Sequence, residues 1–110
     1  MRAACQREIR EETGLEISVG PIVAVAERMQ EGFHYVIVDF LATLRDPASQ
    51  TVRPAGDASD ARWVSLHEID HLELVGGLAR VLRTAAMVRD GLPNRGLVDP
   101  DEAGRDYLAL

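Results

Sequence analysis

Three glutamates lie close together near the start of the chain, in the stretch REIREETGL at residues 7–15. Glu8, Glu11 and Glu12 are three and four positions apart, so a helix would place them on one face, with Cβ atoms about 5–6 Å apart. Like charges at this spacing destabilise a helix, and near its C-terminal end they also oppose the helix dipole. A divalent cation such as Mg²⁺ binds carboxylate oxygens and would remove that cost. The spacing therefore indicates either a metal-binding face or a solvated acidic surface.

These nine residues resemble the second half of the Nudix box, G-x5-E-x7-R-E-U-x-E-E-x-G-U. Every specified position of that half is present, as Arg7, Glu8, Ile9, Glu11, Glu12, Gly14 and Leu15. The resemblance continues to about residue 90, through the segment DARWVSL at residues 60–66 and a helical pattern beyond it.

The resemblance implies a function and a fold. In this family the box forms a loop, helix and loop on an α/β/α sandwich, and its glutamates hold Mg²⁺ or Mn²⁺ against a nucleoside diphosphate linked to another group. It implies that Glu8, Glu11 and Glu12 are metal ligands or act on the attacking water, and that Arg7 holds the carboxylates by ion pairing. Residues 33–44 and 60–66 look most similar to the branch that hydrolyses ADP-ribose or nucleotide sugars.

The first glycine and first glutamate of the box would precede Met1. We therefore expect a Nudix domain that lacks its N-terminal strands, with little or no turnover by these 110 residues. An uncovered sheet edge would favour self-association, because unpaired backbone groups bind another strand. A second hypothesis is a catalytically silent Nudix-like module that binds a partner through that edge.

The first half of the chain predicts a helix followed by two strands. Good helix formers run from residue 3 to Thr13-Gly14, where Gly14 suits the left-handed position after a last turn. Residues 15–29 predict a strand that is interrupted at Gly20-Pro21. After a turn at residues 30–32, the segment 33–44 gives the strongest strand signal. Its alternation places Val36, Val38 and Phe40 on one face and Tyr35, Ile37 and Asp39 on the other.

The second half predicts a loop at residues 45–61, a short strand at 61–66, a helical turn opened by Ser65 and Glu68, and a helix at 75–90. Residues 93–110, with further prolines and glycines, predict a surface tail after a domain at 1–92. Strands joined by short turns pair antiparallel and carry helices on the sheet. The fold class is therefore α/β, and the resemblance implies a Nudix-like α/β/α sandwich with a mixed, largely antiparallel sheet.

A second pattern of possible chemistry is His67-Glu68-Ile69-Asp70-His71, which satisfies the zinc metalloprotease pattern H-E-x-x-H. That motif requires both histidines on one face of a sustained helix and a third ligand. The segment lies in a short capped turn, and His34 is the only other histidine. Surface histidines are the favoured interpretation, and a zinc metalloprotease is a remote alternative.

Other side chains offer weaker candidates. Asp57 and Asp60 could supply another carboxylate, although turn chemistry explains them more simply. Phe33, Tyr35 and Trp63 could stack on a base. Phe33, beside a turn, is the favoured stacking surface, and Trp63, inside a predicted strand, is expected in the core. Cys5 lies on the predicted helix and is expected to be a buried small hydrophobe. It is not expected to act as a nucleophile, because no histidine lies near it in sequence.

Composition limits the partners. With 110 residues the chain suits one domain, and its net charge of −6 would repel nucleic acid and anionic membranes. No apolar run approaches the roughly 20 residues of a membrane span. A single cysteine fits a reducing compartment, so we expect a cytoplasmic protein that acts on a small nucleotide-derived substrate.

Overall fold

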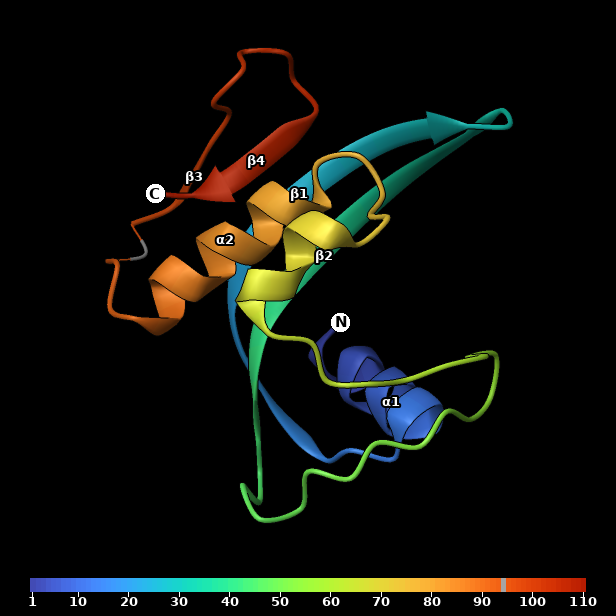
Figure 1. The fold of residues 1–110 in the computed structure, drawn as a ribbon. Coiled ribbons are helices and arrows are strands. Elements are labelled where there is room, and N and C mark those ends of the chain that lie inside the picture. The colour runs from blue at the N-terminus through green and yellow to red at the C-terminus, as the bar shows by residue number, and fades with distance from the viewer. Residues whose placement is uncertain (94) are drawn as a thin grey trace. The chain divides into compact units, whose positions relative to one another are not determined.

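A computed structural model of the chain describes residues 1–93 and 95–110. The elements in chain order are α1 (Arg2–Thr13), β1 (Ile17–Gln30), β2 (Phe33–Leu44), the 3₁₀ helix η1 (Leu66–His71), α2 (Leu78–Arg89), β3 (Leu97–Val98) and β4 (Asp106–Ala109) (Figure 1). None of the helices within the described residues has the length and apolar character of a membrane span.

The helix α1 ends as its sequence predicts. Gly14 has a φ of 77°, in the left-handed region, and its N–H donates to the carbonyl of Arg10 at 2.9 Å. The hydroxyl of Thr13 donates to the carbonyl of Ile9 at 2.6 Å and accepts from the N–H of Leu15 at 3.2 Å. Together these bonds satisfy backbone groups that a helix end leaves without intrahelical partners.

The strands β1 and β2 form a hairpin in which β2 begins at Phe33 as predicted, whereas β1 ends at Gln30, one residue later than predicted. Glu31 and Gly32 have φ values of 53° and 80°. Two consecutive positive φ values are typical of the type I′ turn, whose twist matches that of paired strands. Gly20 and Pro21 do not interrupt β1, which continues through both residues. The expected break is therefore wrong, although the boundary between two compact units of the chain falls between these residues.

Segments distant in sequence complete the sheet. Its strand order is β2-β1-β4-β3, and β4 pairs antiparallel with β1, with Ala24 opposite Leu108 and Ala26 opposite Asp106. β3 pairs antiparallel with β4. The expected surface tail at 93–110 is therefore wrong for its described residues, because β3 and β4 join the sheet and Leu108 and Ala109 are buried, while residue 94 lies outside the described residues. Within the described residues, two α-helices and a four-stranded antiparallel sheet confirm the α/β class and are consistent with the Nudix-like fold.

The chain divides into two compact units. The first comprises residues 1–20 and 42–65, and its buried apolar side chains are Leu15 and Ile17. The second comprises residues 21–41 and 66–110, where α2 contacts both η1 and β4. Its buried apolar side chains are Val23, Ala24, Ile69, Leu108 and Ala109.

Three predictions for residues 61–90 were wrong in detail. Residues 61–65 form no strand, and Trp63 is 56% exposed instead of buried, with its indole N–H donating to the carbonyl of Gln50. The expected helical turn is confirmed as η1. The long helix begins at Leu78, later than predicted, because Gly77 takes a left-handed φ of 85° immediately before it.

Candidate functional site

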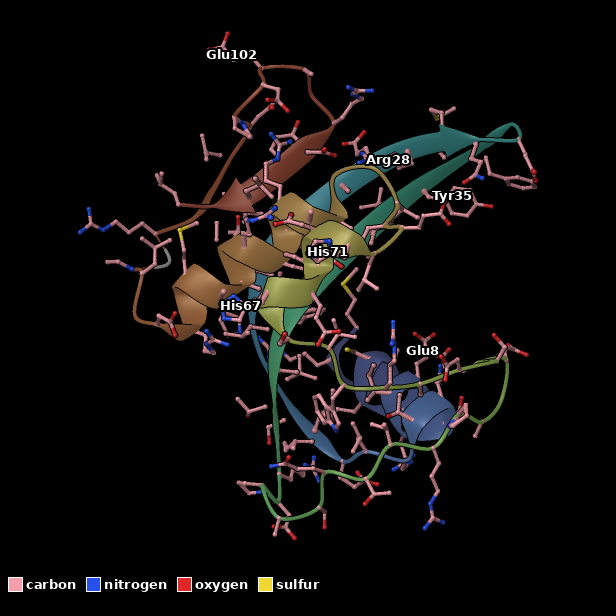
Figure 2. All side chains as sticks on the ribbon, in the orientation of Figure 1. Glu8, Arg28, Tyr35, His67, His71 and Glu102 are labelled. Carbon is pink, nitrogen blue, oxygen red and sulfur yellow. The ribbon has the colours of Figure 1, made fainter. Side chains whose placement is uncertain are left out.

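The helix α1 carries the acidic face that the sequence predicted. Glu8, Glu11 and Glu12 are all exposed on it, and Glu8 and Glu12 share a face because they are four residues apart. Figure 2 labels Glu8 on this helix. The Nε atom of Arg7 lies 3.8 Å from a carboxylate oxygen of Glu11, and both side chains are more than half exposed. This pair contributes little to stability, because solvent screens exposed ion pairs.

The donor chemistry of this face fits a hard divalent cation. Within the described ranges no three His, Cys, Asp or Glu side chains come together as a metal-binding group. Mg²⁺ usually binds one or two carboxylates and completes its shell with water and substrate phosphates. The exposed glutamates of α1 can supply such a partial shell.

A loop of the same unit holds the C-terminal end of α1. The N–H of Arg53 donates to the carbonyl of Thr13 at 3.0 Å, and the N–H of Ala55 donates to the carbonyl of Glu12 at 3.1 Å. Gly56, with a φ of 59°, lies so close that a Cβ there would be 3.5 Å from the carbonyl oxygen of Glu11. The loop therefore satisfies carbonyls that the last helical turn cannot.

The two acidic residues of this loop differ in what surrounds them. Asp57 is exposed and directly follows the Gly56 contact, inside a turn closed by the bond from the Ala58 N–H to the Ala55 carbonyl at 3.0 Å. Asp60 is also exposed. Aspartate is a common turn residue, so this turn explains the presence of Asp57 without a role in metal binding.

The N-terminal end of α1 is bound to the start of β1. The guanidinium of Arg2 donates to the carbonyls of Val19 and Gly20 at 2.6 and 2.7 Å. The amide of Gln6 donates to the carbonyl of Ile17 at 3.3 Å. Cys5, on the same helix, is half-buried and free. Both ends of α1 are thus fixed within the first unit, which gives its glutamates a defined support.

The family model of the NUDIX domain matches residues 1–85, which include α1 with its glutamates and the loop that holds it. The chain belongs to the Nudix family. Members of this family are hydrolases that act on nucleotide-derived diphosphates. The match confirms the predicted membership of the Nudix family. No solved structure matches the chain.

The H-E-x-x-H pattern lies in η1 and not in an α-helix. Successive residues of a 3₁₀ helix turn by about 120°, so His67 and His71 face different directions. Both are exposed and labelled in Figure 2. Between them, Asp70 pairs with Arg83 of α2. This geometry gives no support to the zinc metalloprotease alternative.

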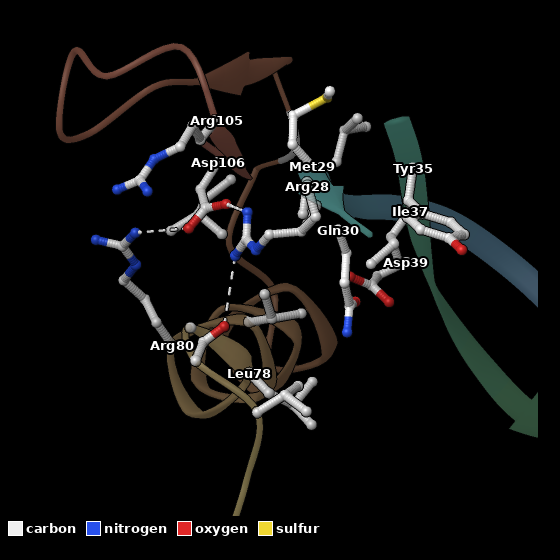
Figure 3. A pocket seen from close by; sticks show the side chains of 18 residues that line it. Arg28, Met29, Gln30, Tyr35, Ile37, Asp39, Leu78, Arg80, Arg105 and Asp106 are labelled. Atoms are coloured by element: carbon white, nitrogen blue, oxygen red, sulfur yellow. Dashed lines mark hydrogen bonds and ion pairs between the residues drawn. The ribbon is translucent and has the colours of Figure 1, made fainter. Parts of the chain in front are cut away.

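The second unit contains a cavity of about 740 Å³ that the sequence did not indicate. It is lined by the last part of β1, the face of β2 that carries Tyr35, Ile37 and Asp39, the start of α2 and the segment of Arg105 and Asp106 (Figure 3). The predicted alternation of β2 is therefore confirmed on this face. Most of the other lining residues are apolar, and they include Met29, Val75, Leu78, Val81 and Leu108.

A network of charged side chains lines part of this cavity. The Nη1 of Arg28 donates to Asp106 Oδ1 at 2.5 Å, and its Nη2 donates to the carbonyl of Gly76 at 3.4 Å. Arg80 binds Asp101 through two hydrogen bonds at 3.2 and 2.8 Å and reaches Asp106 Oδ2 at 3.5 Å. The hydrogen bond from Arg28 lowers the pKa of the Asp106 carboxyl below its ordinary value. The network connects β1, β4 and the start of α2.

Burial raises the pKa of the Asp39 carboxyl, which lies on the β2 face of the cavity. Figure 3 shows Asp39 and Tyr35 on one side of the cavity and Arg80 and Arg105 on the other. Phe33 packs on Tyr35, with ring centroids 6.2 Å apart at a tilt of 51°. The sequence predicted that Phe33 stacks on a base. In the structure its ring contacts the ring of Tyr35, and base stacking by Phe33 stays a prediction.

Proposed function

We propose that this chain is a Nudix domain for Mg²⁺- or Mn²⁺-dependent hydrolysis of a nucleoside diphosphate linked to another moiety, of the ADP-ribose or nucleotide-sugar type. The observation that carries the proposal is the exposed acidic face of α1, inside the region that matches the NUDIX domain. The likeness of residues 33–44 and 60–66 to the ADP-ribose and nucleotide-sugar branch supports the substrate class.

Each box residue has a role in this proposal. The carboxylates of Glu8, Glu11 and Glu12 hold the cation or accept a proton from the attacking water, and Arg7 orients Glu11 through its ion pair. The bound cation supplies positive charge against the diphosphate oxygens. Such charge is needed because the chain carries a net charge of −6 and would otherwise repel an anionic substrate.

Calorimetry with Mg²⁺ or Mn²⁺, together with assays of ADP-ribose and nucleotide-sugar hydrolysis, tests this proposal. We expect weak binding and slow, metal-dependent hydrolysis, both lost in Glu12→Gln. Glu16→Gln is the matched control, because Glu16 is an exposed carboxylate beyond the helix that pairs only loosely with Arg10, at 3.8 Å. Binding and hydrolysis that survive Glu12→Gln would place the site elsewhere. Tight zinc binding lost in His67→Ala would favour the metalloprotease alternative.

A second function, a catalytically silent binding module, is favoured by the exposed edge strand β2. Phe33 is 64% exposed and Val36 is 55% exposed on this strand. Unpaired backbone groups beside exposed apolar side chains favour association with another strand. We propose that the chain self-associates through β2 and acts in the cytoplasm. Sedimentation equilibrium tests the association, with a species of twice the 12.1 kDa chain mass as the expected result. A monomer at all concentrations would refute it.

A further inference from the structure

The strand β2 is suited to pairing with a second copy of itself. It lies at one end of the sheet order, so one of its edges faces no strand of the described chain. Its segment Phe33–Leu41 contains only one acidic residue, Asp39, and neither Lys, Arg nor Pro. Charged side chains and prolines are the usual protection of an edge strand. This edge therefore carries little that would prevent another strand from pairing with it.

The hairpin turn determines which backbone groups face the open edge. With two turn residues, Gln30 and Phe33 form the first hydrogen-bonded pair of the hairpin. Backbone groups alternate in direction along a strand, so those of Tyr35 and Ile37 point toward β1. Those of Val36 and Val38 point toward the open edge.

Symmetry limits the possible registers. In antiparallel pairing, opposed side chains lie on the same face of the sheet. A two-fold axis between the strands must therefore pass midway between the two copies of one residue of β2, so that this residue lies opposite itself. We name each register by that residue. An axis through Asp39 would oppose two carboxylates directly, and an axis through Val38 would place them on the diagonal, about 7–8 Å apart. An axis through Val36 pairs only residues 33–39 of each copy. An axis through Ile37 separates the carboxylates and pairs residues 33–41.

We propose that two copies of this chain pair antiparallel through β2, with the two-fold axis at Ile37. This proposal rests on the self-association proposed above and adds its register. Val36 of each copy lies opposite Val38 of the other, and their outward backbone groups form the hydrogen bonds. Tyr35 of each copy lies opposite Asp39 of the other.

This register gives each cavity a residue from the second copy. Tyr35 and Asp39 lie on the face of β2 that lines the cavity. Opposed side chains of paired strands have Cβ atoms about 4.5–5.5 Å apart, on the same face. The second copy's Tyr35 therefore extends the cavity wall beside Asp39. The dimer site combines a half-buried carboxylate, two tyrosine rings and the guanidinium groups of Arg28 and Arg80.

Cysteine cross-linking tests the register. Ile37→Cys, Val36→Cys and Val38→Cys are each made on a Cys5→Ser background, because Cys5 is the only natural cysteine. In the proposed register only Ile37→Cys opposes itself, at a pair without backbone hydrogen bonds, where Cβ atoms are closest. Under mild oxidation we expect disulfide dimers of Ile37→Cys and few or none of the other two alone. A mixture of Val36→Cys and Val38→Cys should form the mixed disulfide.

The outcomes separate the register from the association itself. Efficient homodimeric cross-linking of Val36→Cys or Val38→Cys would overturn the register and leave self-association standing. A dimer by sedimentation that none of the variants cross-links would place the interface away from β2 and overturn the proposal. A monomer would refute both proposals. Far-UV circular dichroism of each variant confirms that it is folded, and the mixed pair provides a second measurement if one variant is not.

Discussion

Replacing Asp106 by asparagine tests whether the network of Arg28, Asp106 and Arg80 stabilises the second unit. The change preserves the size of the side chain and removes its charge. Asp106 accepts from Arg28 at 2.5 Å and lies 3.5 Å from Arg80, and its side chain is 22% exposed. A hydrogen bond to a charged group contributes about 1.5–3 kcal/mol, and an exposed ion pair about 0–1 kcal/mol. Because the Arg28 side chain is 35% exposed, we expect Asp106→Asn to lower the free energy of unfolding by about 1–2 kcal/mol.

The effect should depend on pH with a defined sign. The folded-state pKa of Asp106 is lowered, chiefly by the hydrogen bond from Arg28. Its contribution is therefore complete above the unfolded-state pKa of about 3.9 and is lost as the pH falls through the lower folded-state pKa. The difference between the wild type and Asp106→Asn should be full at pH 7 and should shrink as the pH falls below about 4.

Urea unfolding followed by far-UV circular dichroism, at pH 7 and at acidic pH, measures both expectations. Asp90→Asn is the matched control, because Asp90 pairs with Arg89 on the open surface, where solvent screens the pair. We expect no measurable change in that variant. A stability difference for Asp106→Asn that is absent at pH 7, or that persists unchanged at acidic pH, would contradict the role assigned to the network.

Three further predictions concern packing and the loops. Gly77→Ala should lower stability by about 1–3 kcal/mol, because Gly77 has a φ of 85° and an added Cβ would lie 3.3 Å from Asp106 Oδ2. A Cβ added at Gly76 would have no neighbour within 4 Å, so Gly76→Ala should be nearly neutral. Thermal unfolding of both variants measures the difference, and an equal loss of stability in Gly76→Ala and Gly77→Ala would refute the steric argument. Val23→Ala should cost about 1–3 kcal/mol in urea unfolding, because Val23 is 1% exposed, whereas Val75→Ala at an exposed position should cost almost nothing. Trp63 should emit as a solvated indole and be quenched readily by acrylamide, and a blue-shifted, protected emission would contradict its exposed position.

Local sequence determined the elements whose stability depends on near neighbours. The helix α1 follows from a run of good helix formers that ends at Gly14, whose left-handed φ few other residues adopt. The boundaries of β2 follow from the turn at Glu31 and Gly32 and from alternating apolar residues after it. The acidic face of α1 could be predicted for the same reason, since residues four apart share a helical face wherever the helix lies.

Tertiary pairing decided the rest. β4 is short and follows a region rich in proline and glycine, and it exists because Ala24 and Ala26 of β1 pair with Leu108 and Asp106. The segment ARWVSL has a strand-like composition but pairs with no strand, so Trp63 stays exposed. The network of Arg28 and Asp106 joins residues far apart in the chain. Composition and periodicity describe near neighbours, and contacts between distant segments form only when the chain folds.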